Sequence, residues 1–165
     1  MKRNITNSLV VFLLLIPSIN FGQEIKQFDF KGIEPFLHKS NDSVYVINFW
    51  ATWCLPCVKE IPAFEKLHET YRNEKLSVIL VSLDFPNKLE QSLIPFIQKN
   101  NIQSKVMLLN DPDSNSWIDK VDPSWSGAIP GTLIYDSSSR KFYEKSFTYE
   151  ELENIISEKI KLKKS

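Results

Sequence analysis

The alternation of apolar and polar positions along this 165-residue chain predicts buried strands interleaved with amphipathic helices. Two stretches, 44–51 (VYVINFWA) and 76–83 (LSVILVSL), are almost wholly apolar and rich in β-branched or aromatic residues. Such runs are typical of strands that are buried on both faces of a sheet. We therefore expect a central sheet with helices covering both of its sides.

Shorter apolar segments predict the remaining elements. Strands are expected at 25–30, 105–109, 132–136 and 141–146, and helices at 33–39, 58–71, 89–99, 113–121 and from Thr148 onward. Thr148 and Glu151 have the spacing of a capping box for the last helix. Crossover helices imply parallel strands, whereas the turn at 136–139 joins the last two strands as an antiparallel hairpin. The predicted fold class is α/β, with one mixed central sheet in a single domain.

The N-terminal segment has a different pattern and is set apart from the fold. Lys2 and Arg3 precede an unbroken apolar run at 9–16, and Pro17 follows it. This pattern predicts a secretory signal peptide at 1–22 and a mature domain at 23–165, exported most simply to a periplasm. An uncleaved membrane anchor facing the same compartment is the alternative, although the run is short of the roughly 20 residues that a spanning helix needs.

Charge and composition exclude some classes of function. Lys plus Arg and Asp plus Glu number 20 each, and loss of Lys2 and Arg3 would leave 18 basic against 20 acidic residues. Nucleic-acid binding normally needs a basic patch or stripe, so we expect no nucleic-acid partner. With 42% hydrophobic and 24% charged residues, the chain has the composition of an ordinary globular protein.

The chain has only two cysteines, Cys54 and Cys57, where the first buried strand gives way to a helix. A disulfide across so short a ring adds little stability, so a chemical role is expected for the pair. At a helix N-terminus, unpaired N–H groups and the helix dipole favour a thiolate. Cys54 could then attack a substrate disulfide, and Cys57, one turn on and more buried, could resolve the mixed disulfide.

Three alternative roles compete with disulfide exchange at the cysteine pair. The first is a zinc site, but tetrahedral zinc needs four ligands, and His38 and His68 are the only histidines, so zinc is not expected. The prediction for this chain includes neither a metal nor a cofactor. A static disulfide in a redox-inert binding protein is a second alternative. Copper delivery is a third, since two cysteines and a histidine can hold this soft metal.

The segment 48–57 (NFWATWCLPC) resembles the active-site segment of thioredoxin-like proteins. The similarity is greatest to the exported TlpA/ResA-type oxidoreductases. Pro62 corresponds to the proline that kinks the family's active-site helix, and Ile129-Pro130 corresponds to its cis-proline. Residues 84–121 are similar to the helical insertion of this branch, and the resemblance extends from about residue 28 to the C-terminus.

The resemblance implies a thioredoxin fold and a monomeric thiol–disulfide oxidoreductase. Cys54 and Cys57 would be catalytic, and Trp53, Ile129 and Pro130 would bind substrate. Ile129 before the proline and Pro56 inside the motif resemble reducing members of the family. Implied partners are protein thiols and disulfides, with apocytochromes or copper-site assembly proteins as candidates, and an upstream membrane electron donor.

Two aromatic side chains near these positions leave a choice open. Trp125 could join Trp53 in an apolar rim beside Cys54, or it could pack within its own loop. Trp50 is expected in the core.

Two positions depart from cytoplasmic thioredoxins. Asn48 and Leu80 stand where those proteins carry a buried Asp and a buried Lys. A neutral amide cannot act as the base for Cys57, so another group or water must accept its proton. Asp84, at the end of the second buried strand, is one candidate, and a turn-capping carboxylate is the equal alternative.

Overall fold

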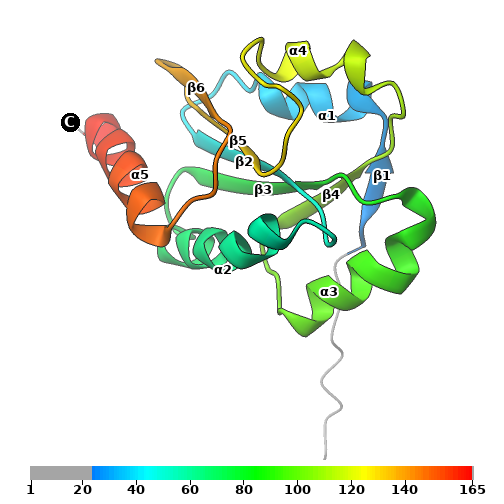
Figure 1. Ribbon diagram of the computed structural model, residues 1–165. Coiled ribbons are helices and arrows are strands. Elements are labelled where there is room, and N and C mark those ends of the chain that lie inside the picture. Colours follow the sequence, from blue (N-terminus) through cyan, green and yellow to red (C-terminus); the bar gives the residue numbers. More distant parts are fainter. Residues whose placement is uncertain (1–23, 165) are drawn as a thin grey trace, which may run out of the picture.

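The computed structural model describes residues 24–164, and its centre is one six-stranded mixed sheet (Figure 1). The strands are β1 (Lys26–Phe28), β2 (Val44–Trp50), β3 (Leu76–Ser82), β4 (Lys105–Leu109), β5 (Gly131–Tyr135) and β6 (Arg140–Tyr143). Their spatial order is β1-β4-β3-β2-β5-β6. The first four in this order are parallel, while β5 runs antiparallel to β2 and to β6. The prediction of a mixed α/β sheet is confirmed.

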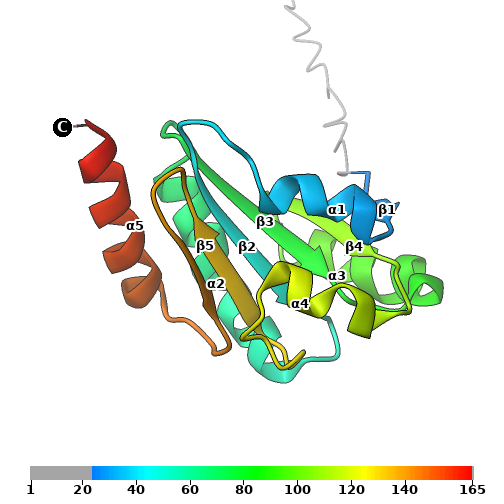
Figure 2. The ribbon, with the colours of Figure 1, turned by 90° about the horizontal axis from the view of Figure 1, so that it is seen from above.

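Helices lie on both faces of the sheet (Figures 1 and 2). They are α1 (Phe30–Leu37), α2 (Leu55–Thr70), α3 (Ile94–Lys99), α4 (Ile118–Val121) and α5 (Tyr149–Lys164). Single turns occur at η1 (Pro86–Lys88), η2 (Leu89–Leu93) and η3 (Ser114–Ser116). Helices α1 and α4 cover one face, and α2, α3 and α5 pack on the other side. In the described part of the chain, no helix is long and apolar enough to cross a membrane.

Strand β2 explains why the sheet must be covered on both sides. All seven of its residues are buried. Val44, Val46 and Trp50 belong to the apolar cluster shared with α2, α3 and α5, whereas Ile47 and Phe49 belong to the cluster shared with α1 and α4. Because side chains alternate across a strand, each face needs its own helical layer to exclude water.

Two strands end earlier in the structure than the sequence pattern predicts. The strand expected at 25–30 ends at Phe28, because the Asp29 carboxylate accepts the Gly32 N–H at 3.0 Å and begins α1. The strand expected at 141–146 ends at Tyr143, because the next residues turn to other partners. Glu144 accepts hydrogen bonds from Ser126, and Phe147 N–H donates to Glu60.

Two predicted helices are broken into shorter pieces. The segment 89–99 forms η2 and α3, and Pro95 lies at their junction, where its missing N–H interrupts the regular ladder. The segment 113–121 forms only η3 and α4. Ser116 Oγ donates to the Asp113 carbonyl at 2.7 Å, and such local bonds compete with a continuous helix.

The last helix begins as predicted. Glu151 N–H donates to Thr148 Oγ1 at 3.2 Å, and Thr148 N–H donates to Glu151 Oε2 at 2.9 Å. These two bonds are the reciprocal pair of a capping box. Helix α2 continues through Pro62. The predicted signal peptide lies outside the described residues.

Candidate disulfide active site

Cys54 and Cys57 form a disulfide at the start of α2, with their Cα atoms 5.3 Å apart. Strand β2 ends at Trp50, and Cys54, a few residues further on, is the N-cap of the helix. Its Sγ accepts the Cys57 backbone N–H at 3.3 Å. After reduction, the same N–H and the positive end of the helix dipole would favour a thiolate at Cys54.

The two sulfur-bearing residues differ in exposure. Cys54 is 6% exposed, and Cys57 is completely buried in the apolar cluster shared with α2, α3 and α5. A sulfur atom arriving from outside therefore reaches Cys54 first. This asymmetry fits the division between an attacking and a resolving cysteine that the sequence suggested.

Residues 129 and 130 lie beside the disulfide although they are far from it in the chain. The peptide bond between Ile129 and Pro130 is cis, and β5 begins directly after it at Gly131. Cys54 Sγ lies 3.7 Å from the Ile129 carbonyl oxygen. The pairing of β5 with β2, in which Gly131 is opposite Phe49, brings this segment to the end of β2 where the cysteines follow.

Trp53 and Trp125, the two candidates for an apolar rim, have different environments. Trp53 is 59% exposed, whereas Trp125 is buried. The Trp125 ring contacts those of Phe49 and Phe142, and its Nε1–H donates to the Ala128 carbonyl at 2.7 Å. A rim shared by Trp53 and Trp125 is therefore wrong. Trp125 makes a hydrogen bond within its own loop, as the alternative predicted, but its ring packs against Phe49 of β2 and Phe142 of β6.

Asp84 is buried and stabilises the turn between β2 and α2. Its carboxylate accepts the Thr52 N–H at 3.0 Å, the Thr52 hydroxyl at 2.5 Å and the Ser82 hydroxyl at 2.8 Å. These contacts give Asp84 the capping role that was one of its two predicted roles. Among the hydrogen bonds of residues 24–164, none joins Asp84 to a cysteine.

Glu60 is a buried carboxyl that the sequence pattern did not bring forward as a site residue. It lies one helical turn after Cys57, and residues three apart on a helix are neighbours. Its oxygens accept Asn48 Nδ2–H at 2.8 Å and the Phe147 N–H at 2.8 Å. Burial raises the pKa of Glu60 to about 7, against the lowering effect of these two bonds. Glu60 therefore has the proton affinity of a group that exchanges protons near neutral pH.

One sequence signal could have revealed Glu60. Cys57, Phe64 and Leu67 are buried residues of one face of α2, and Glu60 occupies the same face by its spacing. A carboxylate at an apolar position of an amphipathic helix needs a partner or a function. Asn48, at the position where cytoplasmic thioredoxins carry a carboxylate, supplies that partner. Its Nδ2 also donates to Thr132 Oγ1 at 3.0 Å.

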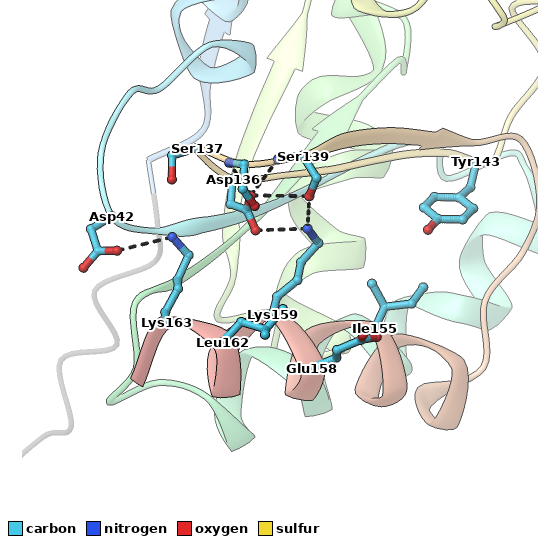
Figure 3. A pocket seen from close by; sticks show the side chains of 11 residues that line it. Asp42, Asp136, Ser137, Ser139, Tyr143, Ile155, Glu158, Lys159, Leu162 and Lys163 are labelled. Carbon is cyan, nitrogen blue, oxygen red and sulfur yellow. Dashed lines mark hydrogen bonds and ion pairs between the residues drawn. The ribbon is translucent and has the colours of Figure 1, made fainter. Parts of the chain in front are cut away.

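A hollow of about 680 Å³ lies between α5 and the β5–β6 hairpin, and neither cysteine lines it (Figure 3). Lys159 crosses it to the Asp136 carboxylate at 3.0 Å, and Lys163 reaches Asp42 at 3.3 Å. Burial works to raise the pKa of Asp136, but hydrogen bonds from Ser138 and Lys159 outweigh it and hold the pKa far below its usual value. These ion pairs tie α5 to the hairpin and to the loop before β2.

Side chains that could bind a metal ion are scattered over the described range. No group of three or more His, Cys, Asp or Glu side chains there is arranged to hold a metal ion. His38 is exposed at the end of α1, and His68 is half-buried on α2.

The sheet order, the helix that begins at the cysteine pair and the proline segment opposite it define a thioredoxin-like protein with a redox-type disulfide. Residues 21–140 match the model of the AhpC/TSA family, so the chain belongs to this family. The thioredoxin-like fold expected from the resemblance is confirmed.

Relatives with similar sequences are named as thioredoxin-like proteins or thiol–disulfide oxidoreductases. The chain is 32% identical over 93 residues to the thioredoxin-like protein YneN of Bacillus subtilis, and the match covers 54% of each protein. It is 27% identical over 139 residues to the thiol–disulfide oxidoreductase ResA of Bacillus cereus, covering 82% of this chain and 68% of ResA. The match thus spans about half the length of YneN and about two thirds of that ResA.

Solved structures share the fold at low sequence identity. A thioredoxin-family thiol:disulfide interchange protein from Chlorobium tepidum superposes with a TM-score of 0.61 at 18% identity, covering 72% of this chain and 81% of that one. StoA from Bacillus subtilis superposes with a TM-score of 0.53 at 20% identity, covering 70% and 83%. A secreted thiol–disulfide isomerase from Corynebacterium glutamicum gives 0.60 at 18%, covering 76% and 73%.

Proposed function

We propose that this protein is an exported thiol–disulfide oxidoreductase that reduces disulfides in protein substrates through Cys54 and Cys57. The observation that carries the proposal is the Cys54–Cys57 disulfide at the N-terminus of α2, with Cys54 as N-cap and Cys57 fully buried. The relatives named ResA and YneN support the same class of activity.

The chemistry is a balanced exchange of sulfur–sulfur bonds. In the reduced protein, the Cys54 thiolate attacks one sulfur of a substrate disulfide, so that one S–S bond breaks and a mixed disulfide forms. The released substrate sulfur takes up a proton. Cys57 then attacks Cys54 Sγ, which restores the protein disulfide and releases the second substrate thiol. The described structure, with its disulfide formed, corresponds to the product state of this reaction.

Glu60 is the group that we assign to the proton of Cys57. Cys57 must lose its proton before it can attack, and Glu60 lies one turn away with a pKa raised to about 7 by burial. A carboxyl with this pKa is partly ionised at neutral pH and can accept the proton. Glu60 would thus supply the carboxylate that position 48 lacks, and the Asn48 amide donates a hydrogen bond to it.

The substrate contacts proposed here come from the residues around Cys54. Trp53 is exposed beside it, and the Ile129 carbonyl lies 3.7 Å from its sulfur. This contact and the cis peptide bond support the proposal that Ile129 and Pro130 bind the substrate beside Cys54. A dithiol donor at the membrane would return the protein to its reduced state, and we propose that it works as a monomer.

Export is part of the proposal and is supported by the apolar run at 9–16 and by the secreted relative from Corynebacterium glutamicum. Mass spectrometry of the protein from its native host tests it. A mature chain that begins near Gln23 supports cleavage of a signal peptide, and an intact N-terminus in the cytosolic fraction would contradict export.

Redox titration and trapping test the activity and its direction. We expect a reduction potential more negative than about −200 mV, and a value near about −120 mV, as in strong oxidants, would contradict the reducing role. A Cys57→Ser variant should accumulate mixed disulfides with its substrates, because no second thiol resolves them. The matched Cys54→Ser variant should trap none, and full biological activity in that variant would favour a redox-inert binding protein.

A further inference from the structure

The segment that ends in Ile129 and Pro130 belongs to a loop, residues 122–130, which connects α4 to β5. The Ile129 carbonyl oxygen lies 3.7 Å from Cys54 Sγ. Connecting loops at a protein surface are normally more mobile than the elements that they join. The position of Ile129 relative to Cys54 therefore depends on the contacts that hold this loop.

One contact that holds the loop is buried. The Trp125 ring is 3% exposed and contacts the rings of Phe49 in β2 and Phe142 in β6. Its Nε1–H donates to the Ala128 carbonyl at 2.7 Å. This contact makes the middle of the loop part of the core, but it leaves residues 126 and 127 without an anchor of their own.

A second contact lies at the surface and comes from the neighbouring strand. Glu144 directly follows β6, whose last residue, Tyr143, pairs with Thr132 near the start of β5. Its carboxylate accepts the Ser126 N–H at 2.8 Å through one oxygen and the Ser126 hydroxyl at 2.7 Å through the other. These two hydrogen bonds hold the pKa of Glu144 below its usual value, because they favour the ionised form.

The Ser126 hydroxyl extends this contact toward Ile129. Because its proton is donated to Glu144, its oxygen is available as an acceptor, and it accepts the Ala128 N–H at 3.4 Å. Both backbone polar groups of Ala128 are thus bonded, the N–H to Ser126 and the carbonyl to Trp125. Ile129 is the next residue, so its orientation is linked to Glu144 through Ser126 and Ala128.

Gly127 is the residue of the loop with the most conformational freedom. Its φ of +91° is in the region that favours glycine, and glycine has no side chain to restrict the backbone. The bond from Ala128 N–H to Ser126 Oγ spans Gly127 and closes the turn around it. Glu144 orients the acceptor of that bond, so it restrains the loop at the point where the chain itself does not.

A second carboxylate in the same loop makes similar bonds with a different result. Asp122 accepts the Ser124 N–H at 2.9 Å and the Ser124 hydroxyl at 2.6 Å. These bonds form a turn at the beginning of the loop, six residues or more before the cis peptide bond. Asp122 therefore organises the loop internally, whereas Glu144 joins the loop to the sheet.

We propose that Glu144 is a positioning residue for disulfide exchange, and that its double contact with Ser126 holds residues 126–129 where Ile129 can bind the substrate chain beside Cys54. Glu144 acts through the loop and not on the reacting sulfur atoms. The inference rests on the proposed oxidoreductase function and adds a determinant of its affinity for polypeptides. A loop that is already in its binding conformation loses less entropy when the substrate binds.

The test uses two substrates that release the same coloured thiol. One is the small disulfide dithiobis(nitrobenzoate), and the other is a synthetic extended peptide whose single cysteine carries one nitrothiobenzoate group. In both reactions the reduced protein gives up two electrons and ends as the Cys54–Cys57 disulfide, while both halves of the substrate leave as thiols. Only the peptide has a backbone that Ile129 can bind. Single-turnover stopped-flow measurements give the maximal rate and the half-saturating concentration for each substrate.

Glu144→Ala should raise the half-saturating peptide concentration by about three- to tenfold, as expected for loss of one net hydrogen-bond contribution. Its maximal rate with the peptide and its rate with the small disulfide should stay within about twofold of wild type. Glu144→Gln can still accept the Ser126 N–H and should give an intermediate value. Ser126→Ala should act in the same direction, and the double variant should be little worse than either single variant. Asp122→Ala is the matched control and should keep the wild-type values.

The outcomes separate the two proposals. If Glu144→Ala keeps the wild-type value for the peptide, or if Asp122→Ala raises it equally, the positioning role is overturned while the oxidoreductase function stands. A large fall in the rate with the small disulfide also overturns it, because that would show general damage to the site. Ser126→Ala provides the same test if Glu144→Ala does not fold. If the wild-type protein reduces neither substrate, the oxidoreductase function fails and the positioning role fails with it.

Discussion

The side-chain amide of Asn48 donates a hydrogen bond of 2.8 Å to the carboxyl of Glu60 in the interior of the protein, one helical turn from Cys57. The pair joins the central strand β2 to the helix that carries both cysteines. The second Glu60 oxygen accepts the Phe147 N–H, so the same carboxyl also fixes the chain entering α5. Glu60 thus links the redox site to the packing of α5, and two predictions follow from it.

Glu60 should make the stability of the oxidised protein depend on pH. Its pKa is raised from 4.5 to about 7 by burial, so the folded state binds the proton more tightly than the unfolded state. The resulting stabilisation is complete below about pH 4.5 and is lost as pH rises through 7. A single shift of this size corresponds to roughly 3 kcal/mol in the free energy of unfolding.

Urea denaturation of the oxidised protein between about pH 4.5 and about pH 8 measures this effect. The disulfide removes the cysteines from the titration, and Glu60→Gln should abolish most of the decline in stability over this range. The same decline in wild-type and Glu60→Gln protein would show that another group is responsible.

Glu60→Gln should also slow the second step of exchange. Without a proton acceptor, Cys57 must ionise unaided, so decay of the mixed disulfide near neutral pH should fall by at least about tenfold. The wild-type rate should reach its plateau at a lower pH than the variant rate. Stopped-flow measurement of this decay across the neutral range gives both profiles, and Glu60→Asp should recover part of the rate. Parallel profiles for wild type and Glu60→Gln would exclude the proton role.

Asp84 should contribute to stability rather than to redox potential. Asp84→Ala leaves the Thr52 N–H and the Ser82 hydroxyl without their acceptor, and the cost should be about 2–4 kcal/mol in unfolding free energy. We expect the reduction potential to change by less than about 10 mV, which is under about 0.5 kcal/mol for a two-electron couple. Equilibration with glutathione measures the potential, and a shift above about 30 mV would restore Asp84 as a group that tunes the cysteines.

Substitution of Trp125 should lower the stability of the protein, whereas substitution of Trp53 should lower its activity. Trp125 is buried among Phe49, Trp117 and Phe142, so Trp125→Ala should cost about 3–5 kcal/mol in unfolding free energy. Trp53 is exposed, so Trp53→Ala should change stability by less than about 0.5 kcal/mol while lowering kcat/KM for protein disulfides. Thermal denaturation and turnover of the two variants test this contrast. Equal losses of stability would contradict the exposure difference seen in the fold.

The Lys159–Asp136 ion pair should contribute to the docking of α5. Their side chains are 18% and 4% exposed, so Lys159→Met should cost about 1–3 kcal/mol by leaving the carboxylate without its cation. The pKa of Asp136 is lower in the folded protein than in the unfolded chain. The ionised carboxylate therefore stabilises the fold at pH values above the usual pKa of an aspartate, and this stabilisation is lost as the pH falls through the pKa of the folded state. Acid titration followed by circular dichroism should show a shallower decline for Asp136→Asn than for wild type. Lys163, whose partner Asp42 is exposed, is the matched control, and Lys163→Met should change stability much less.

The sequence by itself determined the α/β class, the two central strands and the position of the cysteine pair at a strand-to-helix junction. These features depend on local pattern, because the apolar runs of β2 and β3 and the capping pair Thr148–Glu151 carry their own physical signal. The sequence also showed Asn48 at the position where cytoplasmic thioredoxins carry a buried Asp. This difference predicted that another group accepts the proton of Cys57.

Only the tertiary structure decided which residues surround that pair. Glu60 became a candidate acceptor because burial raises its pKa and because Asn48 and Phe147, distant in sequence, supply its hydrogen bonds. Trp125 is buried and Phe85 is exposed, and neither outcome follows from residue type. The exposure of a side chain and the proton affinity of a carboxyl depend on what packs against them, and those neighbours come from other parts of the chain.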